Sequence, residues 1–162
     1  MTELQTSEGR ADAPEQLTPR HDVLKALLDY WLEKKGDRRA PSRSDIDPLE
    51  IAPLLPFVML IGVERTPLRF HYRLVGTEIV RNIGDDLTGH YLDEYVRLGR
   101  DAPMVRDYAR VAAWGPPVCA VWEYTRDDGR HVRYERLALP LSRDGKTVDM
   151  LFGGAVFETA YG

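Results

Sequence analysis

The chain of 162 residues has one cysteine, Cys119, and this scarcity excludes an internal disulfide and any metal site built from several cysteines. No apolar run approaches the roughly 18 residues of a membrane span. Basic residues are not in excess, and the net charge of -4 argues against a nucleic-acid-binding surface. Residues 1–15 have neither a basic start nor an apolar stretch, so they do not have the pattern of a secretory signal. These absences predict a cytoplasmic, single-domain protein that binds neither membrane nor nucleic acid.

The sequence also lacks the patterns that carry catalysis. No glycine-rich loop has the spacing and the lysine of a phosphate-binding motif. No histidine or cysteine stands at metal-ligand spacing, and Asp85 and Asp86 have the composition of a turn. Glu123 and Arg136 are predicted to form a partly exposed cross-strand ion pair. We therefore expect a protein that is not an enzyme, with no catalytic and no metal-binding residues.

The N-terminal third divides into a tail and a helical extension. Residues 1–17 lack apolar periodicity and are predicted to be disordered. Thr18 and Pro19 have the pattern of an N-cap followed by proline at the first helical position. Beyond them, apolar residues recur on one helical face: Leu24, Leu27, Leu28 and Trp31. The extension is predicted to cover residues 18–55, with a second, shorter helix near its end.

The rest of the chain has the element order of an α+β fold. The predicted elements are strands over 57–64 and 68–75 and helices over 77–83, 90–99 and 101–114. Three more apolar runs follow between Pro117 and Phe157. Because the helices lie between two groups of antiparallel strands, this order excludes a doubly wound parallel sheet.

Two turns, Asp128-Gly129 and Asp144-Gly145, join the last three apolar runs and predict a three-stranded antiparallel meander. Two-residue loops would place Trp122 opposite Glu135, and Glu135 opposite Gly154. One face of the meander would then form the core: Val118, Ala120, Trp122, Tyr124, Leu137, Leu139, Leu141, Val148, Met150, Phe152 and Val156. The other face would be mixed: Cys119, Val121, Glu123, Tyr134, Arg136, Ala138, Leu151 and Phe157. A one-residue bulge in either loop would exchange the faces of the strand beyond it.

The mixed face is too apolar to be left in water and needs a cover. The first helix is the local candidate for this cover, and a second copy of the chain is the other. We therefore expect Leu24, Leu28 and Trp31 to build a dimer or partner surface. A homodimer and a signalling partner protein are both predicted.

Glu135 is the one charged residue on the predicted core face, and it has two interpretations. It could lie near the end of the sheet, either solvated or paired with Arg133 or Arg73. Alternatively, it could fix the orientation of a ligand in a cavity with apolar walls. In the second case the cavity would also be lined by aromatic residues, which could equally be ordinary core: Tyr72, Tyr91, Trp122 and Phe152.

The order of two strands, short helices and three strands resembles a PAS domain, above all the stand-alone bacterial PAS proteins with an N-terminal helix. Four stretches carry the resemblance: Leu28-Asp29-Tyr30-Trp31, Phe70-His71-Tyr72-Arg73-Leu74-Val75-Gly76-Thr77, Asp86-Leu87-Thr88-Gly89-His90, and Tyr134-Glu135-Arg136-Leu137-Ala138-Leu139-Pro140-Leu141. The resemblance implies a five-stranded antiparallel sheet over 56–159, with helices on one face, enclosing a pocket. It also implies a role in sensing small ligands and in dimerisation, with the first helix on or near the other face.

The resemblance leaves the cofactor and ligand unknown. Cys119 lies on a predicted strand and not in the helical Asn-Cys-Arg-like motif of flavin photosensors, so flavin is disfavoured. Haem is disfavoured because His90, at the start of a predicted helix, is the only histidine near the helical region. The leading hypothesis is a non-enzymatic PAS-type sensory module. The alternatives are a ligand-free structural adaptor and a small cone-shaped α+β enzyme with an acid-base dyad.

Overall fold

The computed structural model consists of one sheet with helices packed on its two faces, and it describes residues 4–10, 17–94, 103–125 and 128–158. The α-helices and strands, in chain order, are β1 (Leu4–Arg10), α1 (Asp22–Lys35), β2 (Val58–Glu64), β3 (Arg69–Val75), α2 (Thr77–Ile83), α3 (Pro103–Ala112), β4 (Val118–Thr125), β5 (His131–Leu141) and β6 (Met150–Glu158). The 3-10 helices are η1 (Arg43–Asp45), η2 (Pro48–Phe57) and η3 (Leu92–Glu94). The helix predicted over 90–99 is described only as far as η3, and the rest of it lies outside the described residues.

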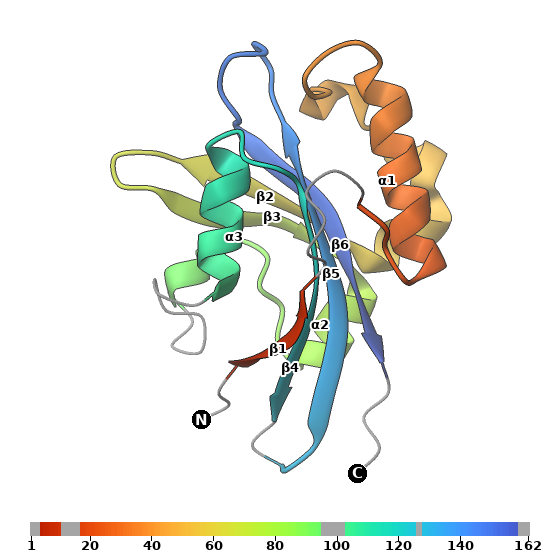
Figure 1. Cartoon of the computed structure of the whole chain (residues 1–162), viewed down its shortest axis with the longest axis vertical. Helices are drawn as coiled ribbons and strands as arrows, with labels where there is room; N and C mark the ends of the chain where they lie inside the picture. The colour runs from red at the N-terminus through yellow and green to blue at the C-terminus, as the bar shows by residue number, and fades with distance from the viewer. Residues whose placement is uncertain (1–3, 11–16, 95–102, 126–127, 159–162) are drawn as a thin grey trace.

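The strands form one antiparallel sheet in the order β1-β4-β5-β6-β2-β3. Its last five strands are the five-stranded antiparallel sheet that was predicted, so the α+β fold class is confirmed. Figure 1 shows α1 and α3 on opposite sides of this sheet. The molecule therefore has three layers, with β5 near the middle of the central one.

Each side of the sheet has its own apolar core. The α3-side core includes Met59, Ile61, Phe70, Tyr72, Ile79, Tyr108, Val111, Trp122, Tyr134, Ala138 and Leu151. The α1-side core includes Leu24, Leu27, Trp31, Val58, Leu60, Cys119, Leu137, Leu139, Leu141 and Phe152. Alternate residues of β5 contribute to the two cores because successive side chains of a strand point to opposite faces.

Local signals in the sequence explain how two of the helices end. Lys34 and Lys35 occupy the last turn of α1, and Gly36 follows with a φ of 55°. Gly84 ends α2 in the left-handed conformation, as its position after the apolar segment predicted. The predicted start of α1 was wrong: the helix begins at Asp22, not at Thr18 and Pro19. Contacts to β5, described below, hold the residues just before α1 in a non-helical conformation.

The predicted disorder of residues 1–17 was wrong for residues 4–10, which form β1 at the edge of the sheet. β1 pairs with β4, with Leu4 opposite Tyr124 and Thr6 opposite Trp122. An edge strand of this kind is held by main-chain hydrogen bonds, which do not require apolar periodicity in its sequence. The sequence pattern therefore gave no sign of it.

The predicted register of the meander was also wrong. Trp122 pairs with Tyr134, one residue from the prediction, because residues 126–130 separate the paired ends of β4 and β5. Glu135 pairs with Val156, two residues from the prediction, because residues 142–149 separate Leu141 from Met150. In this longer loop the Asp144 carboxylate accepts hydrogen bonds from the backbone N–H groups of Lys146 and Thr147.

The one-residue shift separates residues that were predicted to share a face. Trp122 lies in the α3-side core, whereas Leu137 and Phe152 lie in the α1-side core. The first helix therefore contacts the face that carries Leu137, not the face that carries Arg136 as was predicted. None of the described helices is both long and apolar enough to cross a membrane.

Candidate functional site

Two consecutive residues of β5, Glu135 and Arg136, are charged and almost fully buried, with exposed fractions of 2% and 1%. Their side chains point to opposite faces of the sheet because a strand alternates. Glu135 reaches the start of α1, and Arg136 reaches α3. A buried charge is costly unless it is paired and hydrogen-bonded, so the partners of each residue define what it does.

Arg136 lies between aromatic rings in the α3-side core. Its Cζ is 4.8 Å from the ring centroid of Tyr108 and 4.6 Å from that of Trp122. Its Nη2 donates to the Asp107 carboxylate at 3.3 Å, which is a long contact for an ion pair. Within the described part of the chain, Nε and Nη1 of Arg136 and Nε1 of Trp122 are buried without a hydrogen-bond partner. This group, which we call the Arg136 cluster, comprises Arg136, Asp107, Tyr108 and Trp122.

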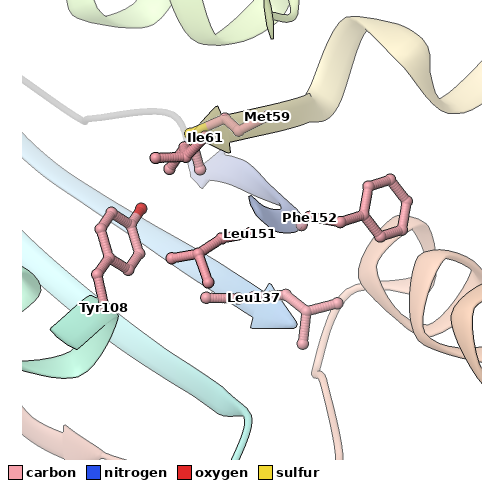
Figure 2. Close-up of a pocket in the computed structure, with 8 residues that line it drawn as sticks. Met59, Ile61, Tyr108, Leu137, Leu151 and Phe152 are labelled. Carbon is pink, nitrogen blue, oxygen red and sulfur yellow. The ribbon is translucent and has the colours of Figure 1, made fainter. Parts of the chain in front are cut away.

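A cavity of about 10 Å³ adjoins the Arg136 cluster, with Tyr108 common to both. Its lining is Met59, Ile61, Tyr108, Leu137, Ala138, Leu151, Phe152 and Gly153. Figure 2 shows Leu151 pointing toward Tyr108 and the Phe152 ring pointing the other way. The space exists where Ala138 pairs with Gly153 and the sheet surface carries almost no side chain. Its volume is about the minimum that a single water molecule needs.

Glu135 holds the start of α1. Its carboxylate accepts hydrogen bonds from the backbone N–H groups of Arg20, at 2.8 and 3.0 Å, and His21, at 3.0 Å. The His21 ring nitrogen Nδ1 lies 2.9 Å from the same carboxylate. Burial opposes ionisation, but these hydrogen bonds outweigh it and lower the pKa of Glu135. The ionised carboxylate lies near the positive N-terminal end of the α1 dipole, where it is stabilising.

Cys119 also contacts this carboxylate, with its Sγ 3.6 Å from Oε2. Burial and the neighbouring negative charge raise the pKa of the Cys119 thiol to about 12. A thiol of this kind is neutral at physiological pH and a poor nucleophile. It therefore acts as a small apolar residue and a weak hydrogen-bond donor.

The sequence matches a protein-family model described as PAS domain over residues 19–156, which is most of the chain. This chain belongs to the PAS domain family. The comparisons with curated proteins and with solved structures gave no match. A PAS domain is a sensory, signalling or interaction module.

The PAS fold brings only part of the predicted ligand site together. Tyr72 and Trp122 are buried in the α3-side core. Tyr91 is half-buried at the margin, where its ring stacks on His71 at 4.6 Å and the Arg69 guanidinium lies 3.7 Å from its centroid. Glu135 and the ring of Phe152 lie on the α1 side. The five residues therefore do not line one cavity, and the one-residue register shift is the reason.

Neither predicted setting of Glu135 describes its contacts. It is buried and not solvated, its partners among the described residues are Arg20 N–H, His21 and Cys119 and not an arginine side chain, and it does not line the cavity beside Tyr108. The predicted ion pair between Glu123 and Arg136 is also wrong. Glu123 instead lies 3.7 Å from His131 and 3.9 Å from Arg133.

The sequence reasoning missed Asp107, Tyr108 and Arg136 as members of one cluster. A signal was present: Arg136 alternates with Tyr134 and Ala138 and is the only charge between apolar neighbours on that face. Its partner Asp107 lies 29 positions earlier, in α3, so no local pattern links them. No group of three or more His, Cys, Asp or Glu that could hold a metal occurs among the described residues.

The predicted dimer-surface residues lie largely inside the chain. Leu24 and Trp31 are buried in the α1-side core, and the Trp31 indole donates to the Pro140 carbonyl at 2.9 Å. Leu28 is half-buried at the edge of this core. One turn further along α1, Leu32 is 48% exposed. Leu28 and Leu32 are thus two apolar residues of α1 that a partner could still contact, and Val23 is also half-buried.

Proposed function

We propose that this PAS domain is a non-enzymatic sensory module, in which a small ligand bound beside α3 changes how β5 holds the start of α1. The observation that carries the proposal is the pair of consecutive buried charges in β5. Arg136 belongs to the side with the cavity, and Glu135 binds the residues that begin α1. Because the two residues are neighbours in β5, a movement of Arg136 can disturb the hydrogen bonds that Glu135 makes to the start of α1.

The Arg136 cluster supports a binding role because it is polar, enclosed and only partly paired. Ligand sites are commonly apolar cavities with a few polar groups that fix orientation. Removing a charge from water costs several kcal/mol, and this cost is recovered only by good pairing. The single 3.3 Å contact to Asp107 leaves part of that pairing unmade. A ligand that accepts hydrogen bonds from the unpaired nitrogens of Arg136 would favour the protein conformations to which that ligand binds.

The Glu135 contacts support α1 as the responding element. Four hydrogen-bond contacts join the Glu135 carboxylate to Arg20 and His21, and each depends on the position of β5. β5 is paired on both sides, with β4 and β6, so its backbone moves as part of the sheet. A displacement of β5 at residue 136 therefore changes the geometry at residue 135.

Hydrogen exchange tests this coupling. In Arg136→Gln, we expect faster exchange of the Arg20 and His21 amides, which donate to Glu135 on the opposite face. Val148→Ala is the control, because Val148 is fully buried in the same core but lies outside β5. Equal acceleration in both variants would mean that general loosening, and not β5, accounts for the effect.

A second candidate function is the ligand-free structural adaptor, and the small size of the cavity favours it. A volume of about 10 Å³ accommodates no organic ligand without movement of the lining side chains. Native mass spectrometry of the protein purified from several hosts distinguishes the two functions. A retained small molecule supports the sensor, and a bare mass from every host supports the adaptor.

The enzyme alternative required a buried carboxylate within reach of a histidine, and Glu135 and His21 meet this distance at 2.9 Å. Their other contacts favour a structural role. The carboxylate also accepts from two backbone N–H groups, and neither residue lines the cavity beside Tyr108. We therefore assign this pair to the start of α1 and not to acid-base catalysis.

We also propose that the module forms a homodimer through the outer face of α1, with Leu28 and Leu32 in the interface. Leu32→Glu should shift the mass measured by light scattering toward the monomer. Leu68→Glu is the matched control, because Leu68 is exposed to a similar extent, 44% against 48%, in the turn between β2 and β3. A dimer that persists in Leu32→Glu, or a monomer in both variants, would contradict this interface.

A further inference from the structure

We propose that the ligand of the α3-side site is a small organic carboxylate with an apolar body, bound by Arg136 and Trp122. This inference rests on the proposed sensory function and names the chemical class that the site would take. Its basis is the set of unpaired donors in the Arg136 cluster together with the apolar lining beside Tyr108.

The unpaired groups are all hydrogen-bond donors. Arg136 has five N–H bonds and no acceptor, and an indole has one N–H and no acceptor. In the described part of the chain, Asp107 is the carboxylate paired with Arg136, and it meets a single nitrogen, Nη2. Nε and Nη1 of Arg136 and Nε1 of Trp122 have no partner. A ligand that satisfies this set must offer acceptor atoms, not donors.

A carboxylate fits a guanidinium better than a neutral acceptor does. Hydrogen bonds between two ions are roughly twice as strong as neutral ones, and a carboxylate has two oxygens that can engage a planar fork. The guanidinium carbon lies over the rings of Tyr108 and Trp122, at 4.8 and 4.6 Å from their centroids. The edge of the guanidinium, where its unpaired N–H bonds point, can bind a planar carboxylate.

The lining beyond the cluster indicates the rest of the ligand. Ala138 lies two residues from Arg136 on the same face of β5, about 7 Å along the strand. It lines the cavity together with Met59, Ile61 and Leu151. These groups are apolar, and apart from the Tyr108 hydroxyl the side chains of the lining offer no polar group, and no cation, for a second charged group of the ligand. The ligand is therefore a monocarboxylate, and it must be small, because only side-chain movement enlarges a space of about 10 Å³.

The three tryptophans of the chain provide an internally controlled assay. The indole N–H of Trp31 donates to Pro140 and that of Trp114 to Lys146, both at 2.9 Å, whereas that of Trp122 has no partner in the described residues. We would titrate 15N-labelled full-length protein with benzoate and with hexanoate, and follow the three indole signals. Benzyl alcohol and hexanol are the uncharged controls, and Trp122→Phe assigns the signal.

We expect benzoate or hexanoate to shift the Trp122 signal and leave those of Trp31 and Trp114 in place. Trp122→Phe retains the ring over the guanidinium and loses the N–H together with its signal, so its affinity is measured by isothermal titration calorimetry and should be several-fold lower. Arg136→Lys retains the charge and loses the fork, and it should weaken binding roughly 10- to 100-fold. If Arg136→Lys does not fold, Trp122→Phe together with the uncharged controls still decides the question.

Two results would overturn the assignment while leaving the sensory function in place. In one, the alcohols bind as tightly as the acids. In the other, neither acid shifts Trp122 although native mass spectrometry finds a retained molecule of another class. If no probe shifts any indole and no host yields a retained molecule, both the carboxylate assignment and the sensory function fail.

Discussion

Replacing Glu135 with glutamine should separate the start of α1 from the sheet. The carboxylate accepts from two backbone N–H groups and lies 2.9 Å from the His21 ring. A glutamine side chain keeps one acceptor oxygen and places an NH₂ donor where the second oxygen accepted. The donor would then face another donor inside a region from which water is excluded.

The expected cost follows from these contacts. A hydrogen bond to a charged group contributes about 1.5–3 kcal/mol, and a neutral one about 1 kcal/mol. Losing one such bond and weakening the others predicts a decrease of about 3 kcal/mol in the free energy of unfolding. In a chain of this length 1 kcal/mol corresponds to roughly 2–4 °C, so Tm should fall by roughly 6–12 °C.

Thermal unfolding followed by circular dichroism measures this change, and Glu123→Gln is the matched control. Glu123 lies on β4 with a partly exposed side chain, and its basic neighbours are 3.7 and 3.9 Å away. Such a pair contributes about 0.2–1 kcal/mol, so Tm should fall by less than roughly 4 °C. Similar changes in both variants would refute the assignment of Glu135 as the residue that holds α1.

The same variant has a definite pH dependence. The pKa of Glu135 is lower in the folded protein than its ordinary value of 4.5, so its ionisation stabilises the fold above that value. This stabilisation is lost as the pH falls below 4.5 and through the folded-state pKa. The stability difference between wild type and Glu135→Gln should therefore be full at neutral pH and shrink in acid. A difference that stays constant would show that charge is not involved.

Three further predictions test other parts of the structure. Cys119, with a thiol pKa raised to about 12, should not react with iodoacetamide in the folded protein at pH 8 and should react after unfolding; rapid native labelling would contradict its burial. Gly153→Ala should destabilise the fold by several kcal/mol in urea unfolding, because the added Cβ would overlap the Leu137 carbonyl. Gly129→Ala, where the obstacle is a φ of 85°, should lower the free energy of unfolding by about 1 kcal/mol. Equal decreases in Gly129→Ala and Gly153→Ala would refute the close approach at Gly153. Trp31→Phe should lower the free energy of unfolding by about 1–3 kcal/mol and Trp114→Phe by less, because both indoles donate at 2.9 Å but only the Trp31 bond is buried; the reverse order in urea unfolding would contradict this reasoning.

Elements with a local cause could be predicted from the sequence. The apolar face of α1 and the glycine that ends α2 depend on residues within a few positions of each other. The strands of the meander were found because Asp-Gly pairs mark where a chain reverses. Those pairs give the position of a turn but not the number of residues in it. Around Asp144 the additional hydrogen bonds to Lys146 and Thr147 widen the loop, and the pairing shifts accordingly.

The candidate site could not be predicted because its contacts are distant in sequence. Glu135 meets His21 across 114 positions, and Arg136 meets Asp107 across 29. With the register displaced by one residue, Arg136 was assigned a surface partner and Trp122 a neighbour on the wrong face. Glu135 was recognised as unusual for a core and Arg136 was not, and the partners of both follow only from the three-dimensional pairing of the strands.

The adjacent charges of β5, Glu135 and Arg136, also restrict the register in which this strand can pair with its neighbours during folding. A slip by one residue would turn Glu135 toward the Asp107 carboxylate and Arg136 toward the positive end of α1. Both placements bring like charges together where water is scarce, and the second would leave the backbone N–H groups before α1 without their acceptor. An apolar strand would lose little by the same slip, because its side chains fit either core. Glu135 and Arg136 thus specify the register of β5, because a shifted pairing of the strand is destabilised.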